Sequence, residues 1–246
     1  MPLTAKRVLK QFRYAMYFNG VNNYVCVKDS DSLHIFGSMT IFYWVIPYFK
    51  PVYQAITTKW DGNYYHEIFV SGLTDSNRFY AIHRNTNGDR IYVETSKTYA
   101  SGLWYSVTVI YDLANLSIIV DGSKSSVPYS GTLYPNTGDL FVGQRGDRQF
   151  WSNVYLANLL IYSRALSDSE IQWNYQNPDK PIRNGLVLWL QADPAYVKDI
   201  DGDGVLEWVD LSGYGNHGKI YGAQLVQLIK TPARLLPPKR VLAPAR

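Results

Sequence analysis

Short runs of apolar and aromatic residues recur along the whole chain, and each run ends at Gly, Asn, Asp or Pro. Examples are AMYFNG, YVCVKD, MTIFYWVIP, WYSVTVIYD, LSIIVDG and VYLANLLIYS. Several runs alternate polar and apolar residues with a period of two, which is the pattern of a half-buried strand. Closely spaced strands of this kind predict an all-β protein, an antiparallel β-sandwich or a barrel, rather than βαβ units.

One segment has the pattern of a helix instead. In LSDSEIQWNYQ, Ser167 is followed three residues later by Glu170. This is the spacing of a capping box, in which each of the two side chains bonds the backbone amide of the other residue. The apolar residues Ile171, Trp173 and Tyr175 follow, and NPDKP ends the segment. We therefore predict one short helix of one or two turns after the main set of strands.

The charge of the chain is divided unevenly. Nine of its 24 basic residues lie in 1–13 and 227–246, which hold no acidic residue. The other 15 basic residues stand against all 20 acidic ones, so the body between the tails has a net charge of −5. A nucleic-acid partner is therefore not predicted, except through the two basic tails.

The cysteine content and the hydropathy pattern bear on disulfide bonding and membrane insertion. Cys26 is the only cysteine, so no intrachain disulfide can form. Because it stands between Val25 and Val27 in a strand-like run, we predict a small buried side chain rather than a reactive thiol. No apolar run is long enough to span a bilayer, and the N-terminus lacks the apolar region of a secretory signal. Membrane insertion is not predicted.

The motifs AMYFNGVNNYVCV, MTIFYWVIP, LWYSVTVIYD, LSIIVDG and NLLIYSRALSDSEI occur in this order. With them, the run from Tyr14 to Tyr175 resembles the laminin-G-like (concanavalin A-like lectin/glucanase) jelly-roll superfamily. The resemblance covers about two-thirds of the chain and implies a concanavalin A-like β-sandwich. Asn19 and Asn23 stand where the family has Asp, which disfavours the calcium site that family members hold near this strand.

The segment after the helix looks like the beginning of such a domain, placed out of order. Residues 185–226, GLVLWLQADP to GAQLV, resemble the family's first strands, and KRVL occurs at both 6–9 and 239–242. We divide the chain into a basic extension (1–13), the sandwich (14–180), the displaced segment (181–226) and a Pro-rich basic tail (227–246).

The displaced segment has three alternative fates. It completes its own sandwich, completes a neighbour's by strand exchange, or begins a second copy. A jelly roll without its first strand exposes a sheet edge, and about forty residues do not fold alone. Closure within the chain is therefore favoured, and strand exchange comes second.

The displaced segment also contains the spacing of a calcium loop. Carboxylates stand at loop positions 1, 3, 5, 9 and 12, with Gly204 at position 6, and a backbone carbonyl would supply position 7. The predicted metal ligands are Asp199, Asp201, Asp203, Val205, Glu207 and Asp210. The alternative is a polar turn, in which Asp210 bonds backbone amides of the following LSGYGN.

Catalysis is not predicted. The superfamily's glucanases carry Glu-x-Asp-x-x-Glu on one strand, and no such pattern occurs here. There is no Gly-x-Ser-x-Gly motif, and the four histidines have no metal-ligand spacing. His217 lies in a GNHG turn, where a structural role is expected.

Two segments carry the residue types that bind sugars, namely aromatic rings for the apolar sugar face and Asp, Asn or Arg for hydroxyls. The candidates are Trp60, Asp61, Asn63 and Tyr64 in KWDGNYYHE, and Arg145, Asp147, Arg148 and Trp151 in GQRGDRQFW. The alternative is a structural role, because the first segment matches the family's core hairpin.

The function implied by the resemblance is a non-catalytic recognition or adhesion module for carbohydrate or glycoprotein surfaces, outside a cell or on a particle surface. The alternatives are a structural or assembly component of a virus particle or surface layer that uses strand exchange, and a divergent glycoside hydrolase.

Overall fold

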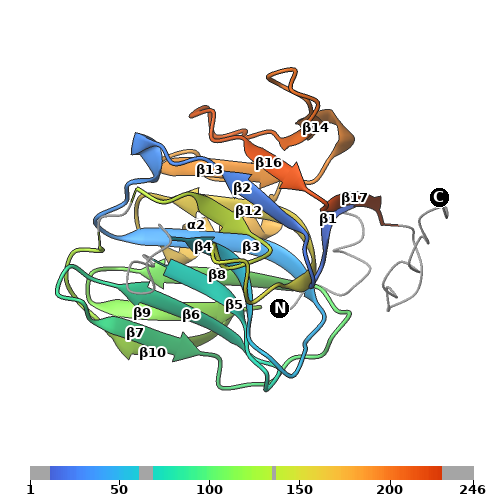
Figure 1. Ribbon diagram of the computed structural model, residues 1–246. Helices are drawn as coiled ribbons and strands as arrows, with labels where there is room; N and C mark the ends of the chain where they lie inside the picture. The colour runs from blue at the N-terminus through green and yellow to red at the C-terminus, as the bar shows by residue number, and fades with distance from the viewer. Residues whose placement is uncertain (1–11, 61–68, 135–136, 229–246) are drawn as a thin grey trace.

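The computed structural model describes residues 12–60, 69–134 and 137–228. Its strands form two antiparallel sheets that pack face to face, so the predicted antiparallel β-sandwich is confirmed (Figure 1). The space between the sheets is filled by one large apolar cluster to which both sheets contribute. This alternation of inward apolar and outward residues is what the period-two runs encode.

The first sheet, sheet A, has eight strands in the order β10-β9-β8-β3-β12-β1-β17, and β13 also pairs with β12. Its strands are β1 (Tyr14–Asn19), β3 (Met39–Pro47), β8 (Tyr105–Tyr111), β9 (Asn115–Val120), β10 (Ser123–Pro128), β12 (Asn153–Tyr162), β13 (Leu186–Gln191) and β17 (Gln224–Gln227).

The second sheet, sheet B, has nine strands in the order β14-β15-β16-β2-β11-β4-β5-β6-β7. Its strands are β2 (Tyr24–Val27), β4 (Gln54–Lys59), β5 (Phe69–Leu73), β6 (Phe79–Arg84), β7 (Arg90–Glu94), β11 (Leu140–Val142), β14 (Val197–Lys198), β15 (Glu207–Trp208) and β16 (Gly218–Tyr221). Two 3-10 turns, η1 (Asp31–Leu33) and η2 (Pro194–Tyr196), lie in connections.

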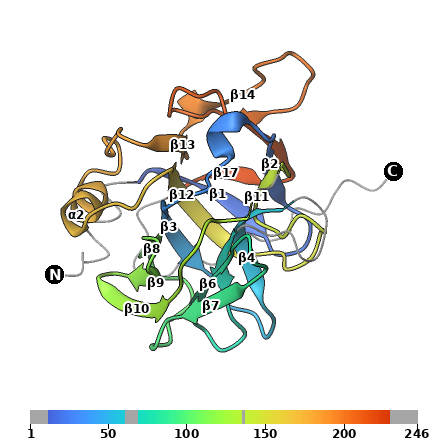
Figure 2. The same cartoon turned by 90° about the vertical axis from the view of Figure 1, so that its left-hand side faces the viewer.

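Helix α2 (Asp168–Gln176) forms where the capping box predicts it. The Ser167 side chain accepts from the Glu170 amide, and the Glu170 carboxylate accepts from the Ser167 amide at 2.9 Å. Glu170 is also ion-paired to Arg164, and these bonds hold its pKa down at about 2. The helix lies on the sheet A side of the sandwich, so it does not cover sheet B (Figure 2). Among the described residues, no helix combines the length and apolar character needed to cross a membrane.

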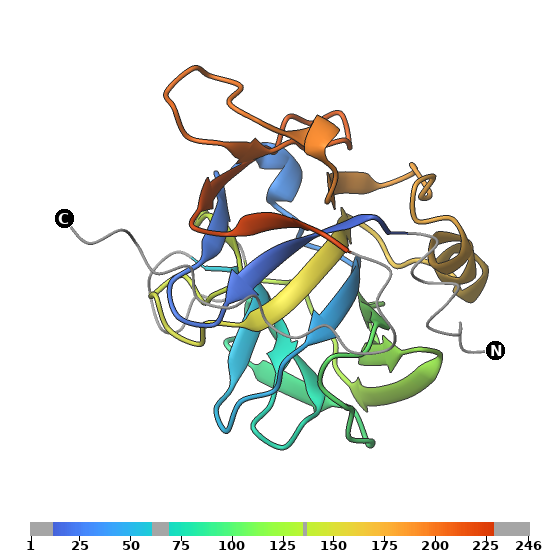
Figure 3. The ribbon, with the colours of Figure 1, turned by 90° about the vertical axis from the view of Figure 1, so that its right-hand side faces the viewer.

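The segment after the helix pairs with strands of its own chain. β1 and β13 lie end to end along the same edge of β12, with Phe18 opposite Val154 and Leu188 opposite Ile161. β17 then pairs with β1 on its other edge, as Figure 3 shows for the red, blue and yellow strands. β16 pairs with β2 in the other sheet. The displaced segment therefore contributes strands to both sheets.

The ends of the sandwich reach slightly further than the sequence predicts. Phe12, which belongs to the predicted N-terminal extension, is buried against Trp44 and Trp104. β17 continues through Gln227, and the amide of the buried Leu228 donates to the carbonyl of residue 13 at 2.8 Å. The reason is that the apolar side chains of Phe12 and Leu228, one at each boundary, are buried in the cluster between the helix and sheet A.

Cys26 is 8 % exposed, so its predicted burial is confirmed. Its thiol lies 3.4 Å from a carboxylate oxygen of Asp139. Burial, together with the negative charge of Asp139, raises the pKa of Cys26 to about 12. Since the thiolate is the reactive form, this thiol has little nucleophilic character at neutral pH.

Candidate functional site

A cavity of about 350 Å³ opens on the outer face of sheet B, the face turned away from sheet A. Outward-pointing residues of β4 to β7 form its floor, and the segment after β11 forms one wall. Its lining consists of aromatic, aliphatic and arginine side chains: Tyr53, Ala55, Val70, Tyr80, Ile82, Arg90, Tyr92, Arg145 and Phe150. The volume lies within the range of small-molecule sites, roughly 300–1,000 Å³.

The aromatic rings of the cavity support one another. The rings of Tyr80 and Tyr92 stack with centroids 5.8 Å apart, and Tyr53 meets Tyr80 edge-on at 5.3 Å. The Tyr92 hydroxyl donates to Glu94 at 2.6 Å, and Glu94 is ion-paired to Arg78 at 2.5 Å. These contacts fix the ring orientations before any ligand arrives, which reduces the entropy lost on binding.

Arg145 is held in place on the wall of the cavity. Its guanidinium lies 4.3 Å from the ring centroid of Phe150 and 5.4 Å from that of Trp60. It is also ion-paired to Asp147, and its Nε lies 3.1 Å from both carboxylate oxygens. An arginine stacked on aromatic rings is a pre-organised donor for carboxylate, sulfate or hydroxyl oxygens.

Phe150 adopts a backbone conformation that bulky residues rarely take. Its φ is +53°, which costs on the order of 1–3 kcal/mol. The conformation is held because the Phe150 carbonyl accepts from the Ala55 amide at 2.7 Å and the next residue, Trp151, bridges to Ala55. The strained loop places the Phe150 ring beside the cavity, and such strain is typical of functional loops.

Of the residues predicted to bind a ligand, Arg145 lines this cavity. Asp147 and Trp60 stand behind it, and Trp60 is only 5 % exposed, so its ring cannot offer a face to a sugar. Arg148 is exposed, and Trp151 lies half-buried with its ring 6.0 Å from that of Tyr24. The remaining candidates, Asp61, Asn63 and Tyr64, lie outside the described residues.

Most of the cavity was missed by the sequence analysis. Tyr80 lies on β6, where the outward residues Tyr80 and Ile82 and the inward residues Phe79 and Ala81 are all apolar or aromatic, which hides the period of two. The clearest overlooked signal is RIYVE in β7, where Arg90, Tyr92 and Glu94 alternate with half-buried or buried aliphatic residues.

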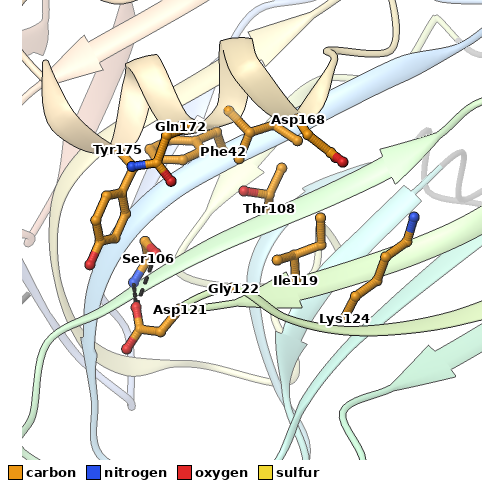
Figure 4. Close-up of a pocket in the computed structure, with 11 residues that line it drawn as sticks. Phe42, Ser106, Thr108, Ile119, Asp121, Gly122, Lys124, Asp168, Gln172 and Tyr175 are labelled. Atoms are coloured by element: carbon orange, nitrogen blue, oxygen red, sulfur yellow. Dashed lines mark hydrogen bonds between the residues drawn. The ribbon is translucent and has the colours of Figure 1, made fainter. Parts of the chain in front are cut away.

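A second cavity, of about 480 Å³, lies between α2 and the outer face of sheet A (Figure 4). Its aromatic residues are committed to the core, because Phe42 is 1 % exposed and Tyr175 stacks on Trp44 at 5.0 Å. Asp121 accepts from both the amide and the hydroxyl of Ser106, and burial raises its pKa. This groove offers polar groups but little free aromatic surface.

The predicted calcium loop brings part of its ligand set together. Carboxylate oxygens of Asp199, Asp201 and Glu207 lie within 4.8 Å of one another. These are loop positions 1, 3 and 9, and three carboxylates suit a hard cation. Asp203, at position 5, instead forms an ion pair with Lys219, whose ammonium also binds Asp201 at 2.8 Å. For Val205, the described bond is its amide donating to Asp203 at 2.9 Å.

Asp210, at loop position 12, lies outside this cluster and organises a turn. Its carboxylate accepts from the amides of Trp189, Ser212 and Asn216 and from the Ser212 hydroxyl. The Asp210 amide donates to Nδ1 of His217 at 3.0 Å. These bonds tie the LSGYGNHG turn to β13, which is the arrangement that the polar-turn alternative describes. Asp210 therefore has the turn role of this alternative, and its role as a calcium ligand stays a prediction.

Calcium binding at the predicted loop stays a prediction, and Asp199, Asp201 and Glu207 are the ligands that lie close together. We expect added calcium to raise the melting temperature relative to chelator, because an ion that binds only the native state stabilises it. In Lys219→Met the ammonium no longer competes for Asp201, so the calcium-induced shift should grow; in Asp199→Asn it should shrink. Equal melting temperatures with calcium and chelator in all three proteins would rule out the site.

The two-sheet jelly roll with a helix against sheet A is the architecture of lectin-like domains. The family model for the concanavalin A-like lectin/glucanases superfamily matches residues 19–172, more than half of the chain. The chain therefore belongs to this superfamily, as its motifs indicate. No curated protein sequence matches the chain significantly.

Solved structures share the fold at low sequence identity. A putative carbohydrate binding protein from Bacteroides ovatus aligns with a TM-score of 0.66 and 17% identity, over 89% of this chain and 60% of that one. A SAP-like pentraxin from Limulus polyphemus aligns with a TM-score of 0.53 and 14% identity, over 66% of this chain and 81% of the pentraxin. The CBM40 domain of a Ruminococcus gnavus sialidase, bound to sialyllactose, aligns with a TM-score of 0.54 and 12% identity, over 64% of this chain and 94% of that domain. At these identities the similarity shows the fold alone, and the chain spans 60% of the length of the Bacteroides protein.

Proposed function

We propose that this chain is a non-catalytic carbohydrate-binding module and that the cavity on sheet B receives the sugar. The observation that carries the proposal is the combination of pre-oriented aromatic rings with two arginines around one cavity. Two proteins of the same fold support it, because one is a putative carbohydrate binding protein from Bacteroides ovatus and the other, from Ruminococcus gnavus, is bound to sialyllactose.

The chemistry of the lining suits a sugar. Pyranose rings present C–H surfaces that pack on aromatic faces, while their hydroxyls need fixed donors and acceptors. Tyr53 is 36% exposed and Tyr92 half-buried, so both rings reach the cavity surface. Arg90 and Arg145 supply N–H donors from two sides. Arg90 on β7 is the arginine placed to meet a carboxylate or sulfate of an acidic glycan, because the charge of Arg145 is balanced by Asp147.

The same lining argues against hydrolysis. Glycosidases of the common type use a pair of carboxylic acids on either side of the scissile bond. None of the described residues that line the cavity is Asp or Glu. Glu94 is near, but its carboxylate is occupied by the Tyr92 hydroxyl and Arg78.

We propose that the glycan binds a sandwich whose strands all come from one chain. β13, β16 and β17 already pair with strands of the same chain, so strand exchange with a neighbour would require these ladders to open first. This favours a self-contained module over an assembly component joined by exchanged strands.

We expect the protein to bind a subset of sugars on an array of defined neutral and acidic oligosaccharides. In Tyr53→Ala the affinity for the array-selected sugar should fall at least about fivefold, because a central aromatic contact contributes about 1 kcal/mol or more. The matched control is Trp173→Ala, which removes a ring that is 47% exposed on α2, and it should bind as the wild type does. Titration calorimetry measures both.

Absence of binding on the array would contradict the proposal. So would equal losses in Tyr53→Ala and Trp173→Ala, because the cavity would then have no special role. Melting curves of both variants show whether either change has affected folding instead of binding.

A further inference from the structure

The aromatic side chains on the outer face of sheet B continue well beyond the cavity. The strand register gives two sets of opposed residues on this face, one on β16 and β2 and one on β4, β5 and β6, which together we call the row. Tyr221 lies opposite Tyr24, Ala55 lies opposite Gly72, and Gly72 lies opposite Tyr80. Because opposed residues in antiparallel strands point to the same face, these positions share the outer surface.

Trp151 lies between the two sets, and at Gly72 the row is covered by the ring of Tyr80. Gly72 has no side chain, and a Cβ built there would lie 2.9 Å from the ring of Tyr80. Trp151 forms a backbone bridge with Ala55, which lines the cavity, and its ring centroid lies 6.0 Å from that of Tyr24. Trp151 therefore connects the cavity to the far half of the row.

The far half of the row is a stacked pair of tyrosines. The rings of Tyr24 and Tyr221 are nearly parallel, with centroids 4.6 Å apart and planes inclined by 12°. Tyr221 is 40% exposed. Neither ring, nor that of Trp151, belongs to the apolar clusters described for this chain. Their contribution to the folded core is therefore small, and exposed aromatic rings in line are a means of recognition.

The row is long compared with one sugar ring. From Tyr221 on β16 to Tyr80 on β6 the row crosses five strand spacings, which is about 24 Å at roughly 4.8 Å per spacing, and the ring of Tyr92 on β7 stacks on Tyr80 at its end. A monosaccharide in the cavity would not reach Tyr24 or Tyr221. Only a ligand that continues from the cavity across Trp151 would contact both halves.

We infer that the ligand is an extended oligosaccharide chain, which begins in the cavity at Tyr53 and Tyr92 and continues over Trp151 to the Tyr24–Tyr221 pair. This inference rests on the proposed function, since it names the length of the glycan that the same face binds. Successive sugar rings stack on successive aromatic rings, so the two halves of the row bind different parts of the oligosaccharide.

Affinity should therefore depend on ligand length. We would titrate the wild type with oligomers of the array-selected sugar, from disaccharide to hexasaccharide, and expect affinity to rise until the ligand reaches Tyr221. Tyr221→Ala should weaken the hexasaccharide about fivefold or more and leave the disaccharide unchanged. Tyr53→Ala should weaken both. The control Tyr214→Ala, a 62% exposed tyrosine of the same segment, should weaken neither.

The possible failures are distinguishable. Binding that is independent of length, or a Tyr221→Ala variant that binds the hexasaccharide as the wild type does, would overturn this inference and leave the proposed function standing. No binding at any length would overturn both. A Tyr221→Ala variant whose affinity falls as much for the disaccharide as for the hexasaccharide would also overturn the inference, because Tyr221 would then affect the cavity itself.

Discussion

Replacing Trp208 by alanine is expected to lower the free energy of unfolding by about 3–5 kcal/mol. Trp208 lies on β15, in the segment that follows the helix, and its side chain is fully buried in the cluster between the sheets. Its indole N–H donates to the carbonyl of Gln191 at 2.7 Å. The change therefore opens a large cavity and removes the partner of a carbonyl. Urea unfolding of the variant and wild type measures the loss.

The matched control is Tyr214→Ala, in the same segment. Tyr214 is 62% exposed, so its removal should change the free energy of unfolding by no more than about 0.5 kcal/mol. If Trp208→Ala were as mild as this control, residues 186–227 would not be part of the core of this sandwich.

Acid is expected to destabilise the protein through His83, by about 2–3 kcal/mol between pH 6.5 and pH 4.5. His83 points inward from β6 and is fully buried against the rings of Phe69 and Tyr111. Within the described residues, neither ring nitrogen has a hydrogen-bond partner. Burial lowers the pKa of His83 from its ordinary value of 6.5 to about 3.

The sign follows from which state binds the proton. Below pH 6.5 the unfolded chain protonates this histidine, while the folded protein keeps it neutral down to about pH 3. Unfolding therefore takes up a proton across this window, and stability falls as the pH falls. Above pH 6.5 both states are neutral at His83, and the group adds no pH dependence.

Two variants separate the effect of protonating His83 from the effect of burying its polar ring. His83→Gln keeps a buried polar group that does not titrate, and His83→Leu removes the polar group as well. Both should lose the slope between pH 6.5 and 4.5, and His83→Leu should also be more stable near neutral pH by about 1 kcal/mol. Urea unfolding over this pH range measures both effects. A slope that is the same in all three proteins would show that His83 is not the cause.

The carboxylates act mainly outside this window. Hydrogen bonds and ion pairs lower the pKa of Asp29, Asp139 and Glu170 below ordinary values of 3.8 for Asp and 4.5 for Glu. Their contribution to stability is present above those values and is lost as the pH falls further. Asp121 has the opposite sign, since burial raises its pKa. The difference between wild type and His83→Gln isolates the histidine from all of them.

The fold could be predicted from the sequence because its signals are local. Ser167 and Glu170 specify the helix start whatever surrounds them, and runs such as LSIIVDG specify a strand and its turn together. The pairing partners of β13 and β17 could be expected only from the family resemblance, since no local pattern says which edge a strand will occupy. The burial of Phe12 depends on Trp44 and Trp104, which are far away in the sequence.

The candidate site was harder to predict, because it depends on which face of a strand points outward. Arg145 was found by its residue type. Tyr80 was not, because its neighbours on β6 are buried on both faces. Asp210 shows the opposite case: its spacing fits a metal loop, but amides of the following turn also bind its carboxylate, so the spacing alone does not say which role it has. Tertiary neighbours thus decide what a motif of this kind does.

A crystal structure of the protein with the array-selected oligosaccharide would test the binding face most directly. We expect sugar rings packed on Tyr53 and Tyr92 at the cavity, with the chain continuing across Trp151 towards Tyr221. Sugar bound only in the groove beneath α2, or only beside the loop of Asp199 and Glu207, would contradict the role assigned to the outer face of sheet B.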